Sequence, residues 1–137
     1  MKVVYNIGIF IFTSLAHIIS PFNLKASLWV KGRKKWAEKI GDKIKPEDRT
    51  VWIHCASLGE FEQGRPVIES IKMEKPELKI VLTFFSPSGY DIRKNYPFVD
   101  VVSYWPSDHQ SDVKQFLDIV NLSCALSCVY EDRILPV

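Results

Sequence analysis

The chain begins with an almost unbroken apolar segment that runs from Val3 to Ile19. At about 17 residues it lies at the lower limit of the length that a helix needs to cross a bilayer. Its polar residues are spaced so that they share one stripe of a helix: Asn6, Thr13, His17 and Ser20. This pattern favours an anchor that lies in the membrane plane or enters it shallowly, and Ser20–Asn23 offers no cleavage signal for a secretory peptide. The alternative is a core helix followed by a solvated basic face.

From Thr50 onward the pattern changes to short apolar runs separated by turn-rich helical stretches. Three runs rich in Val, Ile, Phe and Trp predict strands, at Thr50–Ala56, Lys79–Phe85 and Val99–Trp105. The predicted helices are Glu60–Met73, about Ser88–Asn95, and Ser111 to about Val120. Strands and helices that alternate at this spacing are typical of right-handed βαβ units. The sequence therefore predicts an α/β fold with a parallel sheet flanked by helices.

Basic residues gather directly after the apolar start. Residues 25–49 hold nine Lys and Arg side chains against four Asp and Glu, although the whole chain has a formal net charge of only +2. Such a cluster is attracted to anionic headgroups and favours the cytoplasmic side of a membrane. The mild overall charge excludes a typical nucleic-acid-binding protein. Three cysteines without a CxxC pair indicate neither a disulfide framework nor a zinc site, and Cys124 and Cys128 are interpreted as small apolar residues.

The loop after the first predicted strand carries the first candidate site residue, Glu60. In open parallel sheets, ligands bind outside the carboxyl ends of the strands, where these loops lie. Gly59 is expected to let the backbone turn tightly. Glu60 then stands at a helix N-terminus, which favours its ionised form, and an ionised carboxylate can accept a proton from a sugar hydroxyl. The alternative is a capping box, in which Ser57 and Glu60 satisfy the free backbone N–H groups of the helix.

The loop after the second predicted strand, Ser86–Tyr90, combines small residues with a fresh helix start. Its exposed backbone N–H groups, around Ser88 and Gly89, suit a phosphate or a carboxylate. An ordinary Ser-capped turn is the alternative. Arg65 either reaches an anionic ligand or pairs with Glu69 four residues further along the helix. His54 and His109 lack the spacing of metal ligands, and no metal site is predicted.

Several motifs together resemble the family of 3-deoxy-D-manno-octulosonic acid (Kdo) transferases over about residues 1–120. They are the apolar start, Leu28–Lys34, His54–Glu60, Gly64–Pro66 and Thr83–Tyr90. The resemblance implies the N-terminal half of a GT-B glycosyltransferase: a membrane anchor at 1–24, a basic juxtamembrane segment at 25–49 and a Rossmann-like acceptor-binding domain at 50–137. It also implies an inverting transfer of Kdo from CMP-Kdo to a lipid A precursor, lipid IVA, at the cytoplasmic face of the inner membrane, with no metal or other cofactor.

The resemblance assigns roles to residues of both loops. Glu60 matches the catalytic base of the family's Ser-x-Gly-Glu motif. The residues that would line the acceptor side are Ser57, Gly59, Arg65, Ser88 and Gly89. Two rival hypotheses remain open: a membrane-associated lipid-binding module without catalysis, and another GT-B transferase that acts on a different lipid-linked acceptor.

After about Val120 the sequence departs from the family pattern, and Glu131 matches a second family glutamate in spacing but not in surroundings. We therefore expect a truncated domain without its fourth strand and without the donor-binding half. On this interpretation the 137-residue chain alone has no transferase activity. Its open sheet edge or apolar face would favour aggregation.

Overall fold

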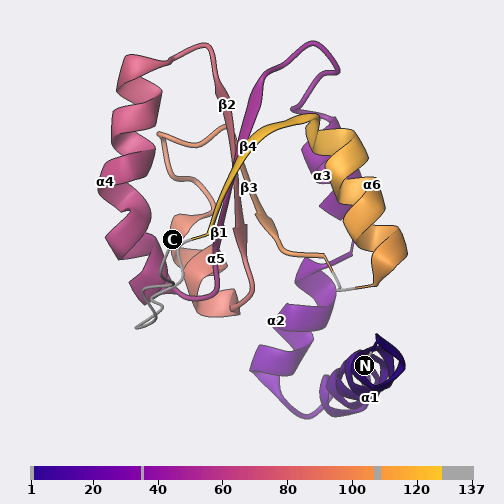
Figure 1. The fold of residues 1–137 in the computed structure, drawn as a ribbon. Coiled ribbons are helices and arrows are strands. Elements are labelled where there is room, and N and C mark those ends of the chain that lie inside the picture. The colour runs from indigo at the N-terminus through magenta and orange to yellow at the C-terminus, as the bar shows by residue number, and fades with distance from the viewer. Residues whose placement is uncertain (1, 35, 107–108, 128–137) are drawn as a thin grey trace, which may run out of the picture.

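A computed structural model describes residues 2–34, 36–106 and 109–127 of the protein (Figure 1). Its centre is a four-stranded parallel sheet in the order β3-β2-β1-β4. The strands are β1 (Thr50–Cys55), β2 (Lys79–Phe84), β3 (Val101–Tyr104) and β4 (Leu122–Ser127). One face is covered by α4 (Leu58–Glu74) and α5 (Pro87–Arg93), and the other by α3 (Trp36–Gly41) and α6 (Gln110–Val120). The predicted Rossmann-like arrangement of a parallel sheet between helices is confirmed.

Each face of the sheet has its own apolar core because neighbouring residues of a strand point to opposite faces. Val51, Ile53 and Cys55 of β1 are buried with Phe61 and Ile68 of α4. On the opposite face the buried residues come from α3, the loop after it, two strands and α6: Trp36, Ile40, Ile44, Val81, Val101, Phe116 and Val120. The basic segment 25–49 therefore contributes three of its apolar residues to the core, in addition to its charges.

The fourth strand, which was expected to be missing, is present. Asn121 ends α6 in the left-handed conformation, with φ at 45°, and its side-chain amide donates to the Pro46 carbonyl at 2.7 Å. This turn leads the chain directly into β4, which pairs with β1 in parallel. Cys124 is exposed on β4, whereas Cys128 and Glu131 lie outside the described residues.

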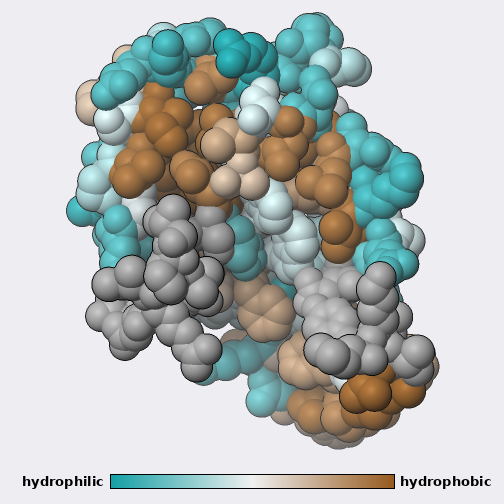
Figure 2. All heavy atoms as spheres, in the orientation of Figure 1, coloured by the Kyte–Doolittle hydropathy of each residue, from teal (hydrophilic) through white to brown (hydrophobic). Residues whose placement is uncertain are grey.

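An apolar groove lies open beside β4, where no further strand pairs with it among the described residues. Val51, Val67, Ile71 and Leu126 contribute to its walls. Figure 2 shows apolar surface over α4 and β4 on this side of the molecule.

A helical hairpin lies at the carboxyl edge of the sheet, formed by α1 (Lys2–Ile19) and α2 (Leu24–Gly32) (Figure 1). Large apolar side chains of α1 are exposed, among them Val4, Ile7, Phe10, Ile11, Leu15 and Ile18. Figure 2 shows the corresponding apolar surface at the lower right. Thr13 and His17, from the predicted polar stripe, instead line a cavity of about 170 Å³ with Trp29 and Trp36. The Asn6 side chain lies outside the described part of the structure.

Within the described residues, no helix taken singly has the length and apolar character for a bilayer crossing. Among the described helices, Ile7–Ile19 and α2 meet those criteria together, and these two helices are bent by 119° relative to each other.

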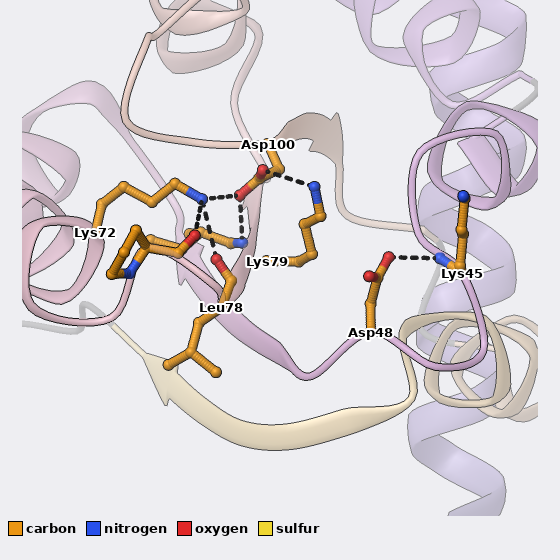
Figure 3. Close-up of polar contacts among 8 residues, drawn as sticks. Lys45, Asp48, Lys72, Leu78, Lys79 and Asp100 are labelled. Carbon is orange, nitrogen blue, oxygen red and sulfur yellow. Dashed lines mark hydrogen bonds and ion pairs between the residues drawn. The ribbon is translucent and has the colours of Figure 1, made fainter.

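An ion cluster joins β2 to the loop before β3 at the opposite edge of the sheet (Figure 3). The Asp100 carboxylate contacts Nζ of Lys72 at 2.8 Å and Nζ of Lys79 at 3.3 Å, and accepts from the Ile80 N–H at 2.8 Å. Burial by itself raises the pKa of Asp100. The hydrogen bonds from Lys72 and Ile80 and the charges of both lysines outweigh burial, so the pKa is lowered below its ordinary value.

We expect Asp100→Asn to lower the free energy of unfolding by roughly 2 kcal/mol near neutral pH, because two partly buried lysines lose their counter-charge. A carboxylate with a lowered folded-state pKa stabilises the fold above its unfolded-state pKa. This stabilisation is lost as the pH falls through the folded-state pKa. Urea unfolding should therefore show the difference between the two proteins narrowing below about pH 4. Asp118→Asn is the control, because the Asp118–Lys114 pair is highly exposed and contributes little. If the difference in unfolding free energy between the parent and Asp100→Asn stays constant with pH, the lowered pKa assigned to Asp100 is wrong.

Candidate active site

The first candidate loop leads from β1 into α4 and places Glu60 in the first turn of that helix. Ser57 is the N-cap residue, and its hydroxyl accepts from the Glu60 N–H at 3.4 Å. The Glu60 carboxylate reaches back, and its Oε2 accepts from the Ala56 N–H at 2.5 Å. The capping interaction that the sequence suggests as an alternative is therefore formed. The Glu60 carboxylate binds the N–H of Ala56, the residue before the N-cap, and not that of the N-cap residue itself. The side chain is partly buried at the carboxyl edge of the sheet.

Gly59 does not form the tight turn that was expected of it. It is the second residue of α4, and no described glycine has a positive φ. It is exposed, and a Cβ built there would meet only the Ser57 hydroxyl, at the ordinary contact distance of 3.8 Å. The fold therefore does not require glycine at this position.

The second candidate loop leads from β2 into α5 and has the structure of a Ser-capped turn. The Ser86 hydroxyl accepts from the Ser88 N–H at 3.3 Å and lies 2.8 Å from the Ser88 hydroxyl. Gly89 is buried, and a Cβ added there would lie 2.3 Å from Cδ1 of Phe84. Glycine is needed here because the helix approaches the strand closely.

Hydrogen bonds between backbones hold the two loops side by side. The Phe85 N–H donates to the Cys55 carbonyl at 3.3 Å, and the Ser86 N–H donates to the Ala56 carbonyl at 3.0 Å. These bonds continue the pairing of β1 and β2 past the ends of both strands. The segment that carries Glu60 and the segment that carries Ser88 thus start from adjacent points, as is typical of ligand sites in parallel sheets.

Arg65 lies further along α4 and pairs with carboxylates of the same helix. Its guanidinium lies 3.1 Å from Glu62 and 3.9 Å from Glu69. The predicted pairing with Glu69 is confirmed. The side chain is about half-exposed, so the pair is of the kind that contributes little to stability.

Arg33, which the sequence motifs do not assign to the site, reaches the second loop from the end of α2. Its guanidinium stacks 3.8 Å from the ring centroid of Trp29 and donates to the Phe85 carbonyl at 3.2 Å. Phe12 of α1 packs against the rings of Trp29 and Phe85. The sequence signal that could have indicated this stack is an aromatic residue and an arginine four positions apart, as in the Leu28–Lys34 motif.

Polar groups also meet on the face of the sheet covered by α6. The buried Thr83 hydroxyl accepts from the Trp52 indole N–H and lies 2.9 Å from Nδ1 of His54. Over the ranges that the structure describes, no group of three or more His, Cys, Asp or Glu side chains is arranged to hold a metal ion.

Comparisons with known proteins show which family the chain is similar to. Residues 34–132 match the family described as 3-Deoxy-D-manno-octulosonic-acid transferase (kdotransferase). The resemblance that was expected to end near Val120 therefore continues through β4 and beyond the described residues.

Three curated relatives are similar over parts of the chain. The 3-deoxy-D-manno-octulosonic acid transferase of Haemophilus influenzae is 31% identical over 121 residues, which are 81% of this chain and 28% of the relative. The corresponding protein of Aquifex aeolicus is 33% identical over 70 residues, covering 50% of this chain and 19% of the relative. A probable mitochondrial 3-deoxy-D-manno-octulosonic acid transferase of Arabidopsis thaliana is 27% identical over 123 residues, or 82% and 28% of the two chains.

The matched region thus spans less than a third of the length of these relatives. Within this chain, however, the family match covers both candidate loops, the sheet and the helices around it. The chain therefore belongs to the 3-deoxy-D-manno-octulosonic acid transferase family.

Proposed function

We propose that this chain forms the acceptor-binding part of a GT-B enzyme that transfers Kdo from CMP-Kdo to the lipid A precursor lipid IVA. The observation that carries the proposal is the position of Glu60, at the carboxyl edge of a parallel sheet in a member of the Kdo transferase family. In this proposal CMP-Kdo binds mainly to a second domain that faces the two loops, and no metal ion takes part.

Glu60 acts as the general base of an inverting reaction. As the acceptor hydroxyl oxygen forms its bond to the anomeric carbon of Kdo, its proton passes to Glu60 and the bond from that carbon to CMP breaks. A carboxylate has two oxygens and several acceptor positions. The hydrogen bond from the Ala56 N–H to Oε2 therefore orients the base and leaves room for a substrate proton.

The acceptor lies between the membrane and the two loops. Ser57, Gly59, Arg65, Ser88 and Gly89 belong to the loops and helix turns that would line its sugar and phosphate groups. The apolar face of α1 and the basic residues of segment 25–49 hold the chain at the cytoplasmic surface of the inner membrane. An acceptor with acyl chains and phosphates is then taken directly from the bilayer surface.

We expect Ile18→Glu to weaken binding to vesicles of anionic phospholipid roughly ten-fold or more, since it replaces an apolar contact with a charge. Ile18 is 66% exposed, so the fold should remain intact. Co-sedimentation with the vesicles measures the binding. Met73→Glu is the matched control, because Met73 is similarly exposed but lies at the far end of α4. Equal binding by both variants would refute the role of α1.

One observation favours the non-catalytic alternative, a module that binds lipid without modifying it. Glu60 already makes a capping contact, which is a sufficient structural reason for a carboxylate at this position. The test is transfer of labelled Kdo by a chimera in which the whole 137-residue chain replaces the matching segment of the Haemophilus influenzae transferase. The proposed function requires transfer to lipid IVA that depends on Glu60. A chimera that prefers another lipid-linked acceptor would instead indicate a different GT-B transferase.

A further inference from the structure

Arg33 contacts one of the two peptide units whose hydrogen bonds, among the described residues, hold the two loops of the candidate site together. Its Nη2 donates to the Phe85 carbonyl at 3.2 Å. The same peptide unit carries the Ser86 N–H, which donates to the Ala56 carbonyl at 3.0 Å. The charged guanidinium thus polarises a peptide whose other end holds the first loop, and such chains of hydrogen bonds strengthen one another.

The chain of contacts continues to the carboxylate. Ala56, whose carbonyl accepts from Ser86, also presents its own N–H to Oε2 of Glu60 at 2.5 Å. Arg33 is therefore linked to Glu60 through two backbone segments without touching it. A shift of the Phe85–Ser86 peptide would move Ala56, and with it the donor that orients the carboxylate.

Arg33 is itself held in place from several sides. It stacks on Trp29 at 3.8 Å and lies 5.2 Å and 5.4 Å from the ring centroids of Phe85 and Tyr104. Gly32 packs so closely against Tyr104 that an added Cβ would lie 2.1 Å from its ring. Burial and then the nearby Asp91 charge raise the pKa of Tyr104 to about 12, so this ring stays neutral near pH 7. The end of α2 is thus seated firmly enough to fix a neighbouring loop.

We propose that Arg33 is a positioning residue for Glu60, acting through the Phe85–Ser86 peptide and Ala56. The proposal rests on the proposed function, because it assigns Arg33 to the same reaction. It also gives the hairpin a second role. Besides contacting the membrane, α2 sets the alignment of the two loops.

The geometric part is tested on the complete 137-residue chain by NMR. Arg33→Gln should shift the Ser86 amide resonance, since the carbonyl of its peptide loses a charged donor. It should also speed hydrogen exchange of the Ser86 and Ala56 amides roughly ten-fold. Lys31→Gln is the control, because it removes the same charge from an exposed position of the same helix. Arg33→Lys keeps the positive charge and the aliphatic part of the side chain but loses the planar guanidinium group. It should therefore give an intermediate shift of the Ser86 amide resonance.

The functional part is tested in the chimera. Arg33→Gln should lower kcat roughly ten-fold with the KM for CMP-Kdo unchanged, because small misplacements of a reacting group are costly. In a Glu60→Gln background, Arg33→Gln should cause no further loss, since both changes affect one unit. A residue that only supports the fold would lower the rate in both backgrounds.

The outcomes separate this proposal from the proposed function. Three results would each overturn the positioning role of Arg33. They are an unchanged Ser86 amide resonance in Arg33→Gln, a further loss of kcat when Arg33→Gln is added to Glu60→Gln, and failure of both Arg33 variants to fold. If Glu60→Gln transfers Kdo at the parental rate, Glu60 is not the general base. The Ser86 resonance would still report whether Arg33 holds the Phe85–Ser86 peptide in place.

Discussion

In the chimeric transferase, Glu60→Gln should lower kcat by roughly 10²- to 10⁴-fold, the usual contribution of a general base. Glutamine has nearly the same shape as glutamate, and its side-chain oxygen still accepts from the Ala56 N–H that now binds Oε2. The capping contact should therefore survive. The glutamine amide is not basic enough to accept the proton of the acceptor hydroxyl, so the general-base function is lost. Rates of labelled Kdo transfer to lipid IVA, measured at saturating substrates, provide the readout.

Glu62→Gln is the matched control for this experiment. Glu62 lies two residues further along α4 and forms ion pairs with Arg65 and Arg93. The same chemical change there should leave kcat nearly unchanged, because partly exposed ion pairs contribute little. Thermal unfolding of both variants should resemble that of the parent. If the Glu60 variant folds normally and transfers Kdo at the parental rate, Glu60 is a cap and the base lies elsewhere.

Two glycines in the candidate site should respond in opposite ways to the same added methyl group. Gly89→Ala should lower the free energy of unfolding by about 1–3 kcal/mol, the usual cost of overpacking a core. The new Cβ would lie 2.3 Å from a ring atom of Phe84, which is fully buried and packed against Phe61. Urea unfolding of the 137-residue chain measures the effect.

Gly59→Ala provides the comparison. Since Gly59 lies within α4 and its added Cβ would be unobstructed, alanine should stabilise the chain by roughly 0.5–1 kcal/mol. If the acceptor approaches the backbone here, the same variant should transfer Kdo more slowly in the chimera. Stability and activity would then change in opposite directions. If the Gly89 and Gly59 variants are equally stable, α5 packs less closely against Phe84 of β2 than the 2.3 Å contact at Gly89 indicates.

Local patterns in the sequence were sufficient for most of the helices and strands. The predicted strands Thr50–Ala56 and Lys79–Phe85 each end one residue before the predicted limit, at Cys55 and Phe84. Their apolar residues must be buried on both faces of a parallel sheet, which produces continuous apolar runs that are visible without a structure. The Ser57–Glu60 cap was equally visible, because capping partners lie only three residues apart.

β4 could not be predicted in the same way. Its residues, Leu122–Ser127, are mostly small and lack a run of β-branched side chains. They become a strand because Asn121 turns the chain toward the open side of β1, where unpaired backbone groups accept a partner. Tertiary context thus outweighs weak local preference.

The α/β pattern, the family and the candidate base could all be inferred from motifs in the chain. Two features became apparent only from the packing of the folded chain. Gly89 rather than Gly59 needs to be glycine, and Arg33 reaches the Phe85 carbonyl from 52 residues away. Periodicity and capping depend on neighbours within one or two turns of the chain. Close packing and contacts between distant loops depend on how whole elements are placed, which no local pattern specifies.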